Sequence, residues 1–193
     1  MKKILIVLTI TFFSVTAKSQ LTKGNWLVGG AGSLSSLKNN YSSSVYSTSS
    51  ERLDIKVAAN LGYFLADNLA IGIRPGFSKF KEVANSAGGG YSNVNRFELG
   101  PFFRYYFLGT DRQFNILTDF SYQHGFYWFK PIKGNSNTFS ASAGTVVFFN
   151  SSVGLELLLG YYIRKEVIKH GGDIKAEDKG LQINIGFQIH LEK

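Results

Sequence analysis

Apolar residues recur at every second position in seven separate stretches of the chain. Between Leu53 and Tyr63 the odd positions are apolar, while the even positions hold small or polar residues such as Lys56 and Asn60. Successive side chains of a β-strand point to opposite faces, so this period of two predicts strands and not helices. The other stretches cover residues 69–77, 97–107, 114–122, 143–149, 153–161 and 181–191. An eighth strand is expected first, near Asn25 to Leu37, where glycines blur the two faces.

The segments that join these strands alternate in length. Short turns are expected at 65–68, 109–112 and 150–152, and long polar loops at 38–50, 81–95, 130–137 and 167–179. This asymmetry is typical of outer-membrane barrels, whose strands need about ten residues to cross the membrane. The pattern therefore predicts an all-β fold, an eight-stranded antiparallel up-and-down transmembrane β-barrel. Its short turns and both termini would face the periplasm, and its four loops would be exposed outside.

Residue size indicates which face of the strands points outward. Glycine gathers on the polar face, whereas the other face carries most of the Phe, Leu and Ile. An eight-stranded tube has room for little more than side chains, so we expect the small residues inside and the bulky apolar ones against lipid. A soluble barrel of the lipocalin type would reverse the two faces, and alternation alone does not separate these arrangements.

Aromatic residues lie near both ends of the apolar face. They predict two girdles at the membrane interfaces, unless they are ordinary aromatic residues of a β core. The expected girdle residues are Tyr63, Phe107, Phe114 and Phe149 near the short turns, and Phe77, Phe97, Trp128 and Phe139 near the long loops.

Six charged residues fall on the face that would line the interior. Buried charges persist only when they are paired and hydrogen-bonded, and three bases with three acids can largely neutralise one another. We therefore expect a salt-bridged lumen filled with side chains and no open pore; in an inverted soluble barrel the same residues would be solvated. The predicted lumen charges are Arg74, Glu98, Arg104, Asp119, Glu156 and Arg164.

Two prolines, Pro75 and Pro101, fall inside predicted strands. Each removes one backbone donor from the ladder, and a closed barrel has no free edge to place it on. Because each proline lies beside a glycine, local β-bulges are expected at both places.

The first residues have the pattern of a secretory signal peptide. Lys2 and Lys3 precede an apolar run of about twelve residues, too short for a membrane helix, and small residues at 17 and 19 predict cleavage after Ser19. Residues 1–19 are thus assigned to the signal and 20–193 to the barrel domain. Without the three lysines of the signal, 18 basic residues face 13 acidic ones, and a net charge of +5 does not favour nucleic-acid binding.

The chain offers little for catalysis or metal binding. It has no cysteine, and its three histidines, His124, His170 and His190, lack the spacing of a metal-ligand set. We expect no cofactor, no metal and no enzymatic activity. A lipid-modifying alternative would use His124 on the apolar face, but the sequence does not place Ser121 or Ser140 beside it.

Lysines are frequent in the segments expected to lie outside the membrane. They could pair with the phosphates of lipopolysaccharide, although ordinary solvated lysines are the alternative. The lysines expected to contact lipopolysaccharide are Lys169, Lys175 and Lys179.

Three stretches of the chain, GYFLADNLAIGIRPGF, GPFFRYYF and SVGLELLLGYY, carry a family resemblance. The first has the order strand, short turn, strand, and it resembles the hairpins of the small outer-membrane β-barrel family, which includes OmpX-like and OmpA-N-terminal-like barrels. The resemblance extends over residues 20–193 and implies insertion into the outer membrane of a Gram-negative bacterium by the outer-membrane assembly machinery. Family members often end in an aromatic residue that this machinery reads, whereas this chain ends in Leu191-Glu192-Lys193.

These observations predict a monomeric barrel with a structural or interaction role, in adhesion or membrane integrity. Three alternatives stay open: a narrow porin-like channel, a soluble periplasmic binding barrel, and a lipid-modifying barrel enzyme. The sequence identifies no extracellular partner.

Overall fold

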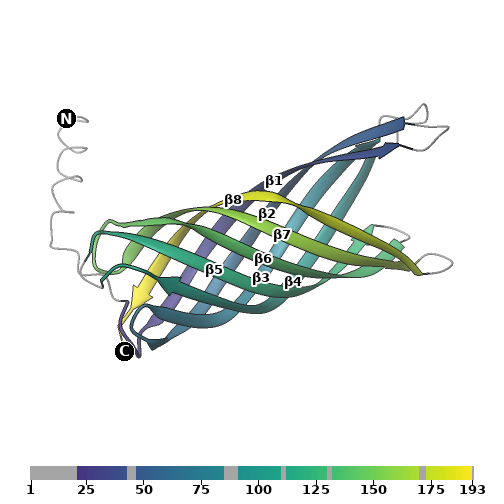
Figure 1. Ribbon diagram of the computed structural model, residues 1–193. Coiled ribbons are helices and arrows are strands. Elements are labelled where there is room, and N and C mark those ends of the chain that lie inside the picture. The colour runs from purple at the N-terminus through teal and green to yellow at the C-terminus, as the bar shows by residue number, and fades with distance from the viewer. Residues whose placement is uncertain are drawn as a thin grey trace, which may run out of the picture.

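The chain folds as one closed barrel of antiparallel strands. The computed structural model describes residues 21–42, 47–84, 91–109, 112–129, 132–169 and 173–192. Eight strands follow one another in chain order, and β1 pairs with β8 to close the barrel (Figure 1). They are β1 (Trp26–Ser42), β2 (Ser47–Ala66), β3 (Leu69–Ala84), β4 (Tyr91–Tyr106), β5 (Phe114–Phe129), β6 (Ile132–Phe148), β7 (Val153–Lys169) and β8 (Asp173–Leu191). The predicted barrel is confirmed. The expected signal peptide, residues 1–19, lies outside the described residues.

The strands are longer than predicted. They contain 16 to 20 residues, and the segments predicted as four long loops are largely strand. Backbone hydrogen bonds carry a ladder whatever its side chains, and beyond a membrane both faces of a strand are polar, so the period of two fades while the strand continues. The tips of these four hairpins lie outside the described residues; we call this the hairpin end of the barrel.

The opposite end, where β1 begins and β8 ends, carries the short turns; we call it the short-turn end. Asp67 and Asn68 alone connect β2 to β3, and Asn68 has a φ of 65°, a left-handed conformation that asparagine tolerates well. The Asn150 side chain accepts hydrogen bonds from the backbone N–H groups of Ser152 and Val153, at 2.9 and 2.7 Å. These two predicted turns are confirmed; the third, 109–112, includes two residues outside the described ranges.

The register between strands fixes their tilt. We call residues that lie directly opposite each other on neighbouring strands register partners. Leu34 of β1 is the register partner of Ile183 of β8. Going from Leu34 through successive register partners on β2 to β7 instead leads to Asp173 of β8, which is ten residues from Ile183. With about 3.3 Å per residue and about 4.8 Å between strands, this stagger tilts the strands by roughly 40°. Figure 1 shows the strong tilt. A row of register partners therefore rises roughly 3 Å toward the hairpin end at each step from β1 to β8, and one residue along a strand spans about 2.5 Å of height.

Large apolar side chains cover the outside of the barrel. Most of those on the outer face are exposed, by 38% to 63%, so the predicted orientation, apolar outward and polar inward, is confirmed. Phe114 and Ile163 mark the two edges of this apolar band, and the register places them roughly 25 Å apart along the barrel axis. The same height separates the interfaces of an outer-membrane barrel. A lipocalin-type barrel would have turned this face inward.

The two prolines interrupt the ladder without a bulge. Pro75 is the register partner of Leu99 of β4. On its other side, the β2–β3 ladder lacks the pair at Pro75 and one adjacent pair, and the β4–β5 ladder lacks the pair at Pro101 and one adjacent pair. Both ladders then resume in the same register. The expectation of bulges is wrong, because losing one donor removes a pair locally without needing an extra residue. Gly100 lets β4 and β5 approach closely beside Pro101, since a Cβ there would lie 1.9 Å from the carbonyl oxygen of Tyr122.

Candidate functional site

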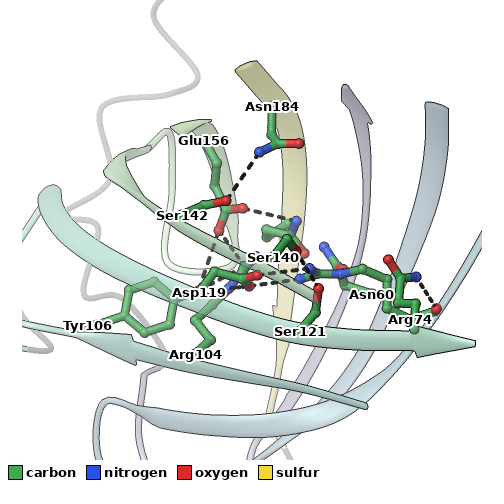
Figure 2. A network of polar contacts seen from close by, with 12 residues as sticks. Asn60, Arg74, Arg104, Tyr106, Asp119, Ser121, Ser140, Ser142, Glu156 and Asn184 are labelled. Carbon is green, nitrogen blue, oxygen red and sulfur yellow. Dashed lines mark hydrogen bonds and ion pairs between the residues drawn. The ribbon is translucent and has the colours of Figure 1, made fainter. Parts of the chain in front are cut away.

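Four predicted lumen charges from four strands meet in one group, the Asp119 network. Arg74 of β3 donates from Nη1 and Nη2 to the two carboxylate oxygens of Asp119 on β5, at 2.8 and 2.7 Å. Arg104 of β4 donates from Nε to Asp119 at 3.0 Å and from Nη1 to Glu156 of β7 at 2.7 Å. Figure 2 shows both guanidinium groups pointing at Asp119. Arg104 and Asp119 are 1% and 2% exposed and the Arg74 side chain is 13% exposed, so most of the network is removed from solvent.

Neutral side chains complete the Asp119 network. Asn60 accepts a hydrogen bond from Nε of Arg74 at 2.6 Å, and Gln188 donates to the second oxygen of Glu156 at 3.1 Å. Every carboxylate oxygen in the network thus has a partner. Buried charges are tolerated when their remaining lone pairs are satisfied in this way.

A second network surrounds Glu98, closer to the hairpin end. Lys56 reaches Glu98 and Gln123 with its ammonium group at 2.5 and 2.6 Å, and the Thr138 hydroxyl donates to the other Glu98 oxygen at 2.7 Å. The predicted charge Arg164 contributes an Nε donor to Thr138 at 3.4 Å. The six predicted lumen charges therefore fall into two neighbouring networks.

Four further lumen charges were not predicted. Lys56 lies in a predicted strand, but Arg96 and Glu166, which form a buried ion pair, lie just beyond the stretches in which the period of two is clear. Their signal is positional, because they lie at even positions, which face the lumen in β2, β4 and β7. With Asp178, the register partner of Arg164, the described lumen residues include five bases and five acids. The charges of these described lumen residues therefore balance.

The lumen at the short-turn end is filled by apolar and aromatic residues, which we call the apolar plug. His190 lies among the rings of Phe64, Tyr106 and Phe148, with centroids 5.4 to 6.1 Å away. Leu21 is fully buried, and its carbonyl oxygen accepts a hydrogen bond from the Asn68 backbone at 2.8 Å. The plug consists of Leu21, Leu27, Phe64, Ala70, Phe102, Tyr106, Leu117, Val146, Phe148 and Leu158. Sequence reasoning expected only small residues and ion pairs inside.

The residues predicted as aromatic girdles lie at two levels of the outer face. Phe107, Phe114 and Phe149 are exposed and Tyr63 is half-buried near the short turns, while Phe77, Phe97 and Phe139 are exposed near the upper edge of the apolar band. Trp128, 43% exposed, lies roughly 10 Å higher than those three by the register.

The lysines predicted to contact lipopolysaccharide do not form one cluster. Lys179 is exposed just above the apolar band, whereas Lys175 is exposed roughly 10 Å higher on β8. The backbone of Lys169 ends β7, and its side chain lies outside the described residues. Lys165 and Asn137, which sequence reasoning did not select, are register partners at nearly the height of Lys179.

The solved structures place this architecture among known folds. The crystal structure of the outer membrane protein OprG from Pseudomonas aeruginosa matches with a TM-score of 0.66 and 14% identity, over 91% of this chain and 100% of that chain. The fold is that of a small outer-membrane β-barrel.

Two further barrels are more distant. The N-terminal β-barrel domain of Pseudomonas aeruginosa OprF has a TM-score of 0.42 and 10% identity, over 88% of this chain and 98% of that chain. Neisserial surface protein A has a TM-score of 0.47 and 12% identity, over 89% and 98%. No protein-family model and no curated protein sequence matches the chain.

The barrel separates the residues of the lipid-modifying alternative. His124 is exposed on the outer face, where its Nδ1 lies 2.8 Å from the Asn137 side-chain oxygen. Ser121 and Ser140 are buried in the lumen and hydrogen-bond to each other at 2.7 Å. A nucleophile needs its base within hydrogen-bond reach, so these serines and His124 do not form a catalytic pair.

Among the described residues no helix is long and apolar enough to span a membrane.

Proposed function

We propose that the chain is an integral outer-membrane β-barrel of a Gram-negative bacterium, a monomer inserted by the outer-membrane assembly machinery, with a structural or interaction role at the cell surface. The observation that carries this proposal is the band of exposed apolar side chains that runs around the barrel at a constant height, outside a lumen filled with side chains. Soluble monomers rarely expose contiguous apolar patches of more than a few hundred Å², whereas this band surrounds the whole barrel. The likeness to OprG supports the proposal at the level of the fold.

The filled lumen favours a structural role over a channel. The Asp119 network and the apolar plug close the lumen at two successive levels. A cavity of about 50 Å³ beside the network, lined by residues including Asn60, Ser142 and Asn184, has room for a few water molecules. A permeating solute would have to break paired charges and displace aromatic rings.

The hairpin end favours a role in surface contacts. The described strands continue roughly 10–20 Å beyond the apolar band, where they carry mostly polar side chains. These paired strands carry a mostly polar sequence above the membrane, which suits adhesion or lateral contacts that maintain membrane integrity.

Membrane insertion is tested by gel mobility of the detergent-extracted protein before and after boiling, together with cell fractionation. We expect the unboiled sample to migrate differently from the boiled one and the protein to appear in the outer-membrane fraction. Identical migration and recovery without detergent would refute insertion.

The closed lumen is tested by single-channel recording in planar bilayers. We expect no steady conductance from the folded protein. A large, steady conductance would favour the porin-like alternative. The surface role is tested in a deletion strain, which we expect to become sensitive to detergent or to lose attachment to surfaces; a strain unchanged in both respects would overturn that role.

A further inference from the structure

Four polar side chains interrupt the apolar outer face on neighbouring strands. His124 of β5, Asn137 of β6 and Lys165 of β7 are successive register partners in one row. Lys179 of β8 lies diagonally beside Lys165, because its own register partner is Ile163. All four are exposed. We call them the rim cluster.

The rim cluster lies at the level where lipid phosphates are found. The row rises roughly 3 Å per strand, and Lys179 is two residues lower in register, so Asn137, Lys165 and Lys179 fall within roughly 3 Å of one another in height. One outward position below them are Phe139, Ile163 and Leu181, the upper edge of the apolar band. The headgroup layer of a membrane begins directly above its hydrocarbon.

Hydrogen bonds hold the uncharged half of the rim cluster in place. The side-chain oxygen of Asn137 accepts a hydrogen bond from the Tyr122 hydroxyl at 3.0 Å and lies 2.8 Å from Nδ1 of His124. Since an amide oxygen only accepts, His124 is the donor in this contact. With its oxygen occupied twice, Asn137 has its NH₂ donor left for a ligand, and its register partner on β7 is Lys165.

Positive charge dominates the other half. One acidic neighbour, Glu177, approaches Lys165 at 4.0 Å, with the two side chains 71% and 49% exposed. An ion pair that is this long and this exposed contributes little, so Lys165 can still attract an anion. Lys165 and Lys179 together are well placed to hold one phosphate between them, because charge-assisted hydrogen bonds from ammonium groups to phosphate oxygens are among the stronger polar contacts.

We infer that the rim cluster binds the phosphate group of an outer-leaflet lipid, with Lys165 and Lys179 supplying the charge, the Asn137 NH₂ supplying a further donor and His124 holding Asn137 in place. The site is one-sided. Lys79 of β3 is exposed at about the same height on another part of the barrel, but its register partners are Ile55 and Asn95, and no second lysine accompanies it among the described side chains. This inference rests on the proposed insertion into the outer membrane.

The test measures binding of bisphosphorylated lipid A to the folded protein in neutral detergent by native mass spectrometry. We expect saturable binding that is lost with dephosphorylated lipid A. Lys165→Gln/Lys179→Gln should weaken it roughly 25-fold, about five-fold for each lysine, whereas the matched control Lys79→Gln should change it less than about two-fold. Equal loss in the control, or equal binding of the dephosphorylated lipid, would overturn the inference.

Two further measurements separate the remaining possibilities. Asn137→Asp keeps the shape of the side chain and adds a negative charge, so it should weaken lipid binding more than Asn137→Ala does; the reverse order would contradict a phosphate ligand. Inorganic phosphate is added as a competitor, and displacement of the lipid at equal concentration would assign the site to a free anion instead. The change of gel mobility on boiling is recorded for every variant. Its absence in the unmodified protein would refute membrane insertion, whereas a normal change without lipid binding would refute the rim site alone.

Discussion

Asp119 provides the most direct test of the closed lumen. It accepts three hydrogen bonds from Arg74 and Arg104 and is 2% exposed. Asparagine has nearly the same shape, so Asp119→Asn opens no cavity and changes mainly the charge. We expect the free energy of unfolding to fall by about 3–5 kcal/mol, the usual cost of removing one partner from a buried ion pair.

The geometry of the network explains this magnitude. If the asparagine oxygen takes the place of the carboxylate oxygen shared by Arg74 and Arg104, those two hydrogen bonds survive but lose their charge assistance. The amide NH₂ then faces Nη1 of Arg74, where a donor meets a donor. Hydrogen bonds to charged groups contribute about 1.5–3 kcal/mol each, so one lost bond and two weakened ones account for the expected range.

The assay is urea unfolding of the protein in phosphatidylcholine vesicles, followed by the fluorescence of Trp26 and Trp128. Ser142→Ala is the matched control, because Ser142 is the register partner of Asp119 and makes a hydrogen bond of 3.5 Å to Asn184. We expect this control to lose less than about 1 kcal/mol. If both variants lose the same small amount, the lumen charges are hydrated and the reasoning for a sealed network is refuted.

Three further substitutions test the backbone and the outer face. Gly100→Ala should prevent folding, because its Cβ would lie 1.9 Å from the Tyr122 carbonyl oxygen, whereas Gly30→Ala should fold, because the atom nearest to its Cβ is 3.6 Å away. Gel mobility before and after boiling measures the folding of both variants. A folded Gly100→Ala variant would contradict the close approach of β4 and β5. Leu159→Arg, near the middle of the apolar band, should cost about 2–4 kcal/mol in the vesicle assay, against about 0–1 kcal/mol for Leu191→Arg at the short-turn end; equal costs would argue against surrounding hydrocarbon. Asn68→Ala should lower the free energy of unfolding by about 1 kcal/mol, because alanine is strained at a φ of 65°. Asn68→Gly should not lower it, because glycine adopts this conformation freely. An equal loss of stability in both variants would assign the effect to the asparagine side chain.

The strands, their order and the orientation of their faces could be predicted because each depends on a local pattern. The alternation over 53–63 identifies a strand wherever it lies in the barrel, and bulky residues on one face with glycine on the other identify the outside. The apolar plug carries the same kind of signal, since Phe64, Phe102 and Phe148 lie at the even positions of the lumen face. The rest of that face is so rich in glycine that these large residues do not change the small average side-chain size of the face.

The strand lengths and the rim cluster could not be predicted from local patterns. Above the apolar band both faces are mostly polar, so the sequence pattern does not mark where a strand ends. Heights on the outer face depend on the stagger, which is set where β1 pairs with β8, a contact between the two ends of the chain. Asn137 and Lys165 are far apart in sequence and become neighbours only through the β6–β7 register.

Strand number and stagger together limit what this barrel can do. Eight strands with a stagger of ten residues give a backbone cylinder of roughly 8 Å radius, in which side chains from opposite walls meet. Closure is therefore a property of the architecture, and the residues decide how the space is filled: by paired charges at the Asp119 network and by aromatic rings in the plug. Because these two levels close the lumen independently, we expect no single substitution to open a path. We therefore expect the function of the barrel to lie on its outer surface, in the apolar band, the rim cluster above it and the polar hairpins beyond.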